Sequence, residues 1–337
     1  MTSSQHICRI CGAFGDHPIF TGREMMFGTR EEFAYFKCTE CGCLQIAEIP
    51  DDLGRYYPPN YNAHNIKISC SHNKLKAFLL KQRFRNAIFD KGYKVNKILS
   101  YFVTMVVPKI EGVLPVTKVL KICHLKNFSA RILDVGCGNW SIWLQRLKLM
   151  GFVNLTGIDP FISSSLEKCG IRILKQSIAQ TEGQFDLITF HHSLEHIINQ
   201  QEFLTHAQRL LAPDGVILIR IPTVSSYAWE KYGVNWIEMD PPRHLYLHSK
   251  ESINLLGQQA GLELFETLHD SYEFEFYGSE QYLQDIPLVA DSSYWKDKNS
   301  SIFSKQEIAA FKMLAEEVNR KGVAGRAAFF FRAQTHK

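Results

Sequence analysis

Hydrophobic and polar positions divide the chain into three segments, of which the last shows the clearest pattern. From residue 131 to the end, short apolar runs alternate with longer segments of helical spacing. This alternation predicts a parallel sheet with helices on both faces, an α/β fold of the Rossmann-like, doubly wound type. We expect strands at 131–135, 154–159, 171–174, 185–190, 216–221, 262–267 and 327–331, and helices at 141–150, 201–211 and 249–260.

The middle segment, residues 66–130, is expected to be helical. It has few glycines and many Lys and Leu residues, and Leu75, Phe78, Leu79 and Leu80 have helical spacing. Pro108 and Pro115 should divide it into at least two helices. Fourteen Lys and Arg against two acids give residues 67–131 a net charge of +12, which leaves −8 for the remainder.

The first segment, residues 1–65, contains two Cys-x2-Cys pairs separated by 26 residues, Cys8 with Cys11 and Cys38 with Cys41. Four thiolates at this spacing can surround a zinc ion tetrahedrally and leave no open coordination position. We therefore predict a zinc ribbon with a structural metal, although four unrelated thiols are the alternative. Cys43 is left over.

Composition and charge restrict the function only loosely. A hydrophobic content of 45% and a charged content of 21% are ordinary for a globular protein. We expect no signal peptide, and the most apolar run, residues 98–107, is shorter than the roughly 20 residues that a membrane-spanning helix needs. The odd number of cysteines suits a reducing compartment. These features predict a cytoplasmic protein, with a possible peripheral position on the inner membrane.

A glycine turn between the first strand and the first helix of the third segment indicates a nucleoside site. The turn reads Asp134-Val135-Gly136-Cys137-Gly138. Its glycines let the backbone approach a ligand, and the start of the helix offers free N–H groups. Asp159 follows the next strand, where a carboxylate can accept both hydroxyls of a ribose.

Two cofactors compete for such a site. A dinucleotide site carries a third Gly or Ala where this chain has Ser141, and Asp134 would repel a pyrophosphate. A carboxylate at that position suits a cofactor with an ammonium and a sulfonium instead. The residues therefore favour S-adenosylmethionine, with a ligand-free glycine turn as the remaining alternative.

Further motifs follow in order along residues 131–335: Gly157-Ile158-Asp159-Pro160, Phe185-Asp186-Leu187-Ile188, Ser193-Leu194-Glu195-His196, Leu211-Ala212-Pro213-Asp214-Gly215 and Pro242-Arg243-His244-Leu245. In this order they resemble the class I S-adenosylmethionine-dependent methyltransferases, which implies their seven-stranded sheet. The resemblance implies that Asp134, Gly136 and Gly138 hold the methionine part of the cofactor and Asp159 its ribose. Cys137 and Pro160 are also candidate cofactor-binding residues, and Phe161 and Ile178 are candidate neighbours of the adenine. The family usually has a glycine where this chain has Trp140.

The end of the first segment carries a second resemblance. The stretch Tyr56-Tyr57-Pro58-Pro59-Asn60-Tyr61 follows the cysteine pairs. A zinc ribbon ending in this way resembles those of bacterial enzymes that act in surface-polysaccharide and sugar-modification pathways. That resemblance implies a sugar, nucleotide sugar or lipid-linked glycan as the methyl acceptor.

Histidines supply the candidate catalytic groups. Methyl transfer from a sulfonium is a direct displacement, so positioning contributes most of the acceleration, and an oxygen acceptor also benefits from a base. His191 and His192 follow the fourth strand, and His244 follows the fifth on a loop stiffened by two prolines. These three are the candidate catalytic residues, whereas Glu195-His196 reads more simply as a structural helix start.

Two other functions remain open. A zinc-ribbon methyltransferase of RNA would use the basic segment, although the acidic remainder makes nucleic acid the less favoured partner. A protein that kept the fold without catalysis would be explained by Trp140. The basic segment with its aromatic residues also suits contact with an anionic membrane. Whether the acceptor atom is O, N or C stays open.

Overall fold

The computed structural model describes residues 3–58, 74–91, 114–299 and 302–334. Its larger sheet has eight strands in the order β12-β13-β10-β9-β5-β6-β8-β7. Their bounds are β5 (Arg131–Val135), β6 (Asn154–Ile158), β7 (Leu166–Lys168), β8 (Ile171–Leu174), β9 (Phe185–His191), β10 (Leu211–Pro222), β12 (Leu262–His269) and β13 (Arg326–Ala333). The expected α/β methyltransferase fold is confirmed, but the sheet is mixed rather than parallel. β13 is antiparallel to both of its neighbours, and β7 forms a hairpin with β8.

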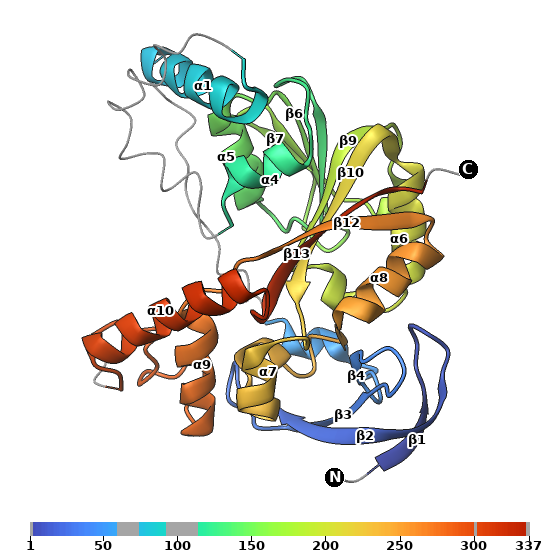
Figure 1. Ribbon diagram of the computed structural model, residues 1–337, viewed down its shortest axis with the longest axis vertical. Coiled ribbons are helices and arrows are strands. Elements are labelled where there is room, and N and C mark those ends of the chain that lie inside the picture. The colour runs from blue at the N-terminus through green and yellow to red at the C-terminus, as the bar shows by residue number, and fades with distance from the viewer. Residues whose placement is uncertain (1–2, 59–73, 92–113, 300–301, 335–337) are drawn as a thin grey trace.

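Helices cover both faces of this sheet (Figure 1). On one side lie α1 (Lys74–Phe89), α4 (Val116–Ile122) and α5 (Ile142–Met150), and on the other α6 (Gln200–Arg209) and α8 (Lys250–Gln259). Successive strand residues point to opposite faces, so Ile132 packs in the core with α1, α4 and α5, whereas Leu133 packs in the core with α6 and α8. Both faces are therefore buried, as a doubly wound sheet requires.

Several elements were not expected from the sequence. They are β7 and the helices α7 (Tyr227–Tyr232), α9 (Phe274–Leu283) and α10 (Lys305–Lys321). The helices α9 and α10 form an insertion between β12 and β13 that projects from the edge of the sheet (Figure 1). The expected turn at 213–215 is an irregularity inside β10, where the register shifts and Asp214 has φ +61°. Short 3-10 helices lie at Leu53–Tyr56, Ile178–Gln180, Leu194–His196, Gly233–Asn235 and Ile237–Met239.

The N-terminal segment forms a second sheet of five strands that borrows one strand from the larger domain. It contains β1 (Ser3–Ile7), β2 (Phe14–Arg23), β3 (Glu32–Lys37), β4 (Leu44–Ile46) and β11 (Tyr246–Leu247), in that order. Each strand is antiparallel to the next. Phe36 and Leu44 of this sheet belong to the same hydrophobic core as Ile221 of β10. The two sheets are therefore packed together, and we call residues 3–58 the N-terminal module.

Within the part of the chain that the structure describes, no helix combines the length and the apolarity needed to cross a membrane. The apolar run at 98–107 and Pro108 lie outside the described residues, as does Tyr61.

Candidate cofactor and acceptor site

The glycine turn joins β5 to α5 and has the backbone conformation that the sequence suggests. Gly136 and Gly138 have φ of +72° and +62°, in the left-handed region that favours glycine. A Cβ built on Gly138 would meet no heavy atom within 4 Å, so the space above it is open. The turn thus presents exposed backbone at the carboxyl edge of the sheet, where α/β folds bind nucleosides.

Asp134, the next-to-last residue of β5, lies buried below this turn and stabilises the residues around it. Its carboxylate is 3% exposed and accepts hydrogen bonds from Ser141 Oγ at 2.6 Å and Thr189 Oγ1 at 2.7 Å. Burial raises the pKa of Asp134 to about 6, although both hydroxyls favour its charged form. Ser141 Oγ also accepts from Leu144 N and so caps α5. Asp134 therefore fixes the start of the helix, and its contact with a cofactor ammonium stays a prediction.

Asp159, at the end of β6, is tied to the same turn. Its Oδ2 accepts from Gly138 N at 3.0 Å, and its Oδ1 accepts from Phe161 N at 2.8 Å. Each carboxylate oxygen can accept a second hydrogen bond, so both can still receive a ribose hydroxyl. The Phe161 ring beside it is 95% exposed. The exposed ring of Phe161 can stack on an adenine, and the remaining lone pairs of Asp159 can accept ribose hydroxyls, so the two residues together suit an adenosine group.

The other candidate cofactor residues differ in accessibility. Pro160 is exposed, whereas Ile178 is only 2% exposed and packs in the core. The Cys137 side chain turns toward β6, where a Cβ on Gly157 would lie 2.6 Å from its Sγ. Trp140 is partly buried against the core that contains α5, and Lys168 Nζ lies 5.8 Å from the centre of its ring.

A second group of polar side chains lies directly beside the turn. Ser193 Oγ donates to Val135 O at 2.9 Å, which fastens the segment after β9 onto the strand that leads into the turn. A Cβ on Gly136 would lie 2.6 Å from Ser193 Cβ. The residues that follow Ser193 are therefore held next to the candidate cofactor site.

Glu195 is the centre of this group. Its side chain is fully buried, and neither carboxylate oxygen has a hydrogen-bond partner within the described part of the chain. Oε1 lies 3.4 Å from His192 Nδ1 and 4.0 Å from His244 Nε2. Burial raises the pKa of Glu195 to about 7. Possible metal-ligand atoms of Glu195, His196 and His244 lie within 4.8 Å of one another, near enough to bind one small cation.

Hydrogen bonds define the proton positions of two of these histidines. His244 Nδ1 lies 2.7 Å from Glu238 O, and a carbonyl can only accept, so the proton is on Nδ1 and the neutral ring leaves Nε2 as an acceptor. His244 Nε2 is 4.0 Å from Asp240 Oδ2 as well as from Glu195. His196 Nδ1 donates in the same way to Arg243 O at 2.9 Å, and Tyr57 Oη lies 3.1 Å from that nitrogen.

The structure thus brings His192, His196 and His244 together around Glu195 and places His191 and His248 elsewhere. His191 packs its ring 4.6 Å from that of Trp143 on α5, and burial lowers its pKa to about 3. His248 has both ring nitrogens bonded, to Ser252 and Gln200, and is structural. Sequence reasoning missed Tyr57 at this site and took Glu195 for a structural residue, because the motifs that contain them do not show that these two distant segments meet in the fold.

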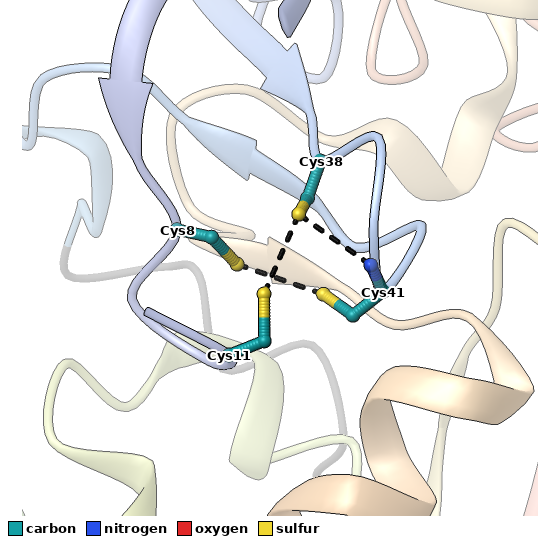
Figure 2. A group of neighbouring side chains, drawn as sticks. All are labelled: Cys8, Cys11, Cys38 and Cys41. Atoms are coloured by element: carbon teal, nitrogen blue, oxygen red, sulfur yellow. Dashed lines mark hydrogen bonds between the residues drawn. The ribbon is translucent and has the colours of Figure 1, made fainter. Parts of the chain in front are cut away.

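The four predicted metal ligands form one cluster (Figure 2). Their sulfur atoms all lie within 4.8 Å of one another, with Cys8 and Cys41 3.6 Å apart and Cys11 and Cys38 3.5 Å apart. Tetrahedral zinc with Zn–S bonds of about 2.3 Å needs sulfur separations of about 3.8 Å. Gly12 and Gly42 have φ of +75° and +71°, as the two knuckle turns require. The sulfurs fit a metal, and Cys43 stays outside the cluster.

Comparisons with known proteins agree with this architecture. Residues 107–267 match the family model described as "Methyltransferase domain". The chain is 26% identical over 126 residues to a ubiquinone biosynthesis O-methyltransferase of Azorhizobium caulinodans, covering 34% of this chain and 49% of that one. It is 28% identical over 160 residues to the enzyme of that name from Maricaulis maris, covering 42% and 62%. The chain thus spans about half of the length of the curated relatives it matches.

Solved structures are more distant. The mycolic acid cyclopropane synthase CmaA1, in complex with S-adenosylhomocysteine, has a TM-score of 0.41 and 17% identity over 76% of this chain and 95% of that one. A possible histamine N-methyltransferase of Thermotoga maritima has a TM-score of 0.38 and 16% identity over 75% of this chain and all of that one. The sheet and the glycine turn agree with the match of residues 107–267 to a methyltransferase domain.

Proposed function

We propose that the protein transfers a methyl group from S-adenosylmethionine to a hydroxyl of a sugar, a nucleotide sugar, a lipid-linked glycan or a related small polar acceptor. The observation that carries the proposal is the buried Glu195 carboxylate. It has no hydrogen-bond partner among the described residues, faces His192 and His244, and stands beside the glycine turn. A buried polar group without a partner is costly, and an acceptor hydroxyl would supply the missing hydrogen bond.

The cofactor half of the site fits the adenosine and methionine parts of S-adenosylmethionine. Asp159 has lone pairs left for the ribose, Phe161 offers an exposed ring for the adenine, and the open space at Gly138 admits the chain that links ribose to methionine. When bound, this cofactor supplies a methyl group activated by a sulfonium. The residues of the chain then need only to position the acceptor and remove its proton.

His244 is the group that we expect to accept this proton. Its Nδ1–H is fixed on Glu238 O, so Nε2 has a free lone pair and faces Glu195 and Asp240. The proton of the acceptor hydroxyl would therefore move to His244 Nε2 as the oxygen attacks the methyl carbon. His192 is placed to orient Glu195.

Oxygen is the favoured acceptor atom because the curated relatives are named O-methyltransferases. The polar and charged side chains around Glu195 favour an acceptor with several hydroxyls. Two ion pairs, between Arg220 and Asp270 and between Arg326 and Glu238, add charge near His192. A phenolic acceptor is the second candidate, and the printed name of these relatives, which refers to ubiquinone biosynthesis, favours it.

A methyl-transfer screen tests the proposal. The full chain is incubated with S-adenosylmethionine and either a panel of UDP- and dTDP-sugars or a panel of catechols, and products are read by mass spectrometry. A gain of 14 daltons on a nucleotide sugar supports the proposal, and a gain only on catechols replaces it with the phenolic function. Binding of S-adenosylhomocysteine without any transfer to either panel contradicts both acceptors. Absence of binding contradicts the enzyme itself.

We also propose that Cys8, Cys11, Cys38 and Cys41 hold a structural zinc ion, because their sulfur atoms form one cluster.

We further propose that α1 contacts an anionic membrane surface from the cytoplasmic side. α1 buries Leu80, Phe84 and Ile88 against the domain, whereas Phe78 is 57% exposed and Arg85, about two turns further along the helix, is also exposed. A helix with a basic, partly apolar outer face suits a membrane interface. Co-sedimentation with phosphatidylserine vesicles at low salt tests this role, and equal pelleting of the Phe78→Ser variant would contradict it.

A further inference from the structure

An ion bridge joins the N-terminal module to the loop that carries His244. Arg243 and Glu24 are both fully buried, and Arg243 Nη2 lies 2.8 Å from Glu24 Oε1. The same guanidinium donates from Nε to Asp240 Oδ2 at 2.9 Å, from Nη2 to Asp240 Oδ1 at 2.5 Å and from Nη1 to Tyr56 O at 3.3 Å. Arg243 therefore holds three chain segments at once, of which two belong to the N-terminal module.

Glu24 is rigidly placed for this contact. It directly follows β2, and its carboxylate accepts hydrogen bonds from Phe27 N, Thr29 N and Thr29 Oγ1. Because three donors of its own loop hold this carboxylate, its orientation does not depend on the contact with Arg243. The planar fork of an arginine can then bond to two carboxylates in a fixed relative orientation.

His244 is the next residue and is held from the same side. Tyr35 of β3 donates from its hydroxyl to His244 O at 2.8 Å, and Ile46 of β4 donates from its N–H to Leu245 O at 3.0 Å. From the other side, Leu245 donates to Glu195 O at 2.9 Å. The backbone of this loop is thus clamped between the N-terminal sheet and the segment that carries Glu195.

We propose that Arg243 is a positioning residue for His244, and that the bridge from Glu24 through Arg243 to Asp240 makes the N-terminal module a working part of the acceptor site. The proposal rests on the proposed function for the role of His244. Asp240 faces His244 Nε2 at 4.0 Å, so the bridge fixes the carboxylate beside the base as well as the loop that carries it. The guanidinium itself points toward the N-terminal module, where it contacts Tyr56 O and Glu24.

The test compares Glu24→Gln, Glu24→Ala and Arg243→Lys with Glu31→Gln as the matched control. Glu31 belongs to the same module and pairs with Arg55, but both side chains are about half exposed. Two readouts need no acceptor: the affinity for S-adenosylhomocysteine, and hydrogen–deuterium exchange of the peptide that covers 240–248. The third readout is kcat and KM for transfer to the nucleotide-sugar panel.

We expect Glu24→Ala and Arg243→Lys to lower kcat at least tenfold and to speed exchange at 240–248 at least tenfold, with affinity for S-adenosylhomocysteine within twofold of wild type. Glu24→Gln, which keeps an acceptor oxygen for Arg243, should lie between Glu24→Ala and the control. The proposal would be overturned if Glu24→Ala and Arg243→Lys had the exchange rates and the kcat of Glu31→Gln. It would also be overturned if these two variants lost affinity for S-adenosylhomocysteine by the same factor as they lost kcat. If Glu24→Ala does not fold, Arg243→Lys decides. Absence of transfer by the wild type refutes the proposed function alone, since exchange still tests the bridge.

Discussion

A Cβ on Gly136 would lie 2.6 Å from Cβ of Ser193, and that serine in turn donates to Val135 O at 2.9 Å. The glycine of the cofactor turn is therefore required twice, for its φ of +72° and for the close approach of the segment that leads to Glu195. This single contact joins the cofactor half of the site to the acceptor half.

Gly136→Ala should therefore damage both halves. The added methyl group needs a strained backbone and also displaces Ser193, so we expect a loss of stability of about 1–3 kcal/mol and at least tenfold weaker binding of S-adenosylhomocysteine. Calorimetry and urea unfolding give the two numbers. Gly138→Ala is the matched control for strain alone, since its Cβ would meet no neighbour. Equal stability losses for the two variants would show that the contact with Ser193 is unimportant.

Phe161→Ala should separate binding from folding. Because the ring is 95% exposed, its removal should change the free energy of unfolding by less than about 0.5 kcal/mol. Stacking on a base contributes about 1–3 kcal/mol, so affinity for S-adenosylhomocysteine should fall at least fivefold. Phe14→Ala, which removes another exposed phenylalanine from the N-terminal module, is the control and should bind like wild type. Unchanged affinity in Phe161→Ala would place the adenine elsewhere.

The sequence predicted best what neighbouring residues determine. The glycine turn and the two cysteine knuckles each lie within a few consecutive residues, and the structure places them as expected. Strand β5 matches its predicted bounds, since an apolar run with a sharp polar boundary leaves little choice of ends.

What the sequence could not predict depends on contacts between distant residues. Glu195 looked like the first turn of a helix, and only the fold shows that its carboxylate is buried without a hydrogen-bond partner among the described residues. The bond between Glu24 and Arg243 joins positions 219 residues apart. The two-residue strand β11 is too short to show an alternation of apolar and polar residues, yet it pairs with β4 and so attaches the larger domain to the N-terminal module. Such contacts follow from packing, which no local pattern encodes.

Cys41→Ser should show that the metal supports both sheets. Loss of one thiolate opens the predicted zinc site, and Cys41 O also accepts a hydrogen bond from Ser249 Oγ, which caps α8. We expect zinc to fall from one atom per chain to well below one, and the melting temperature to drop by about 10 °C or more. Plasma mass spectrometry and calorimetry measure these quantities. Cys43→Ala, a buried cysteine outside the cluster, should keep its zinc. If the wild type had the same melting temperature with and without its metal, the structural role of the metal would be refuted.

Glu195→Gln should stabilise the protein while it abolishes transfer. Burial raises the pKa of Glu195 from 4.5 to about 7, so the folded chain holds a proton between these values that the unfolded chain has released. Stability contributed by this group therefore falls as pH rises from about 4.5 to 7, and above pH 7 the native state carries the full cost of a buried charge. The neutral amide avoids that cost. We expect the variant to be more stable at pH 8 by on the order of 1–3 kcal/mol, with kcat lowered at least a hundredfold.

The pH dependence of this difference is the decisive measurement. Urea unfolding of the wild type and Glu195→Gln at pH 4.5, 6 and 8 should give a stability gap that is near zero at the lowest pH and grows through the window. Buried histidines such as His191, whose pKa is lowered to about 3, destabilise both proteins in acid by the same amount and cancel in the comparison. Glu202→Gln, which changes an exposed side chain of α6, is the control and should show no gap at any pH. A gap of constant size would mean that Glu195 is charged in the folded protein throughout, and that its carboxylate has a partner.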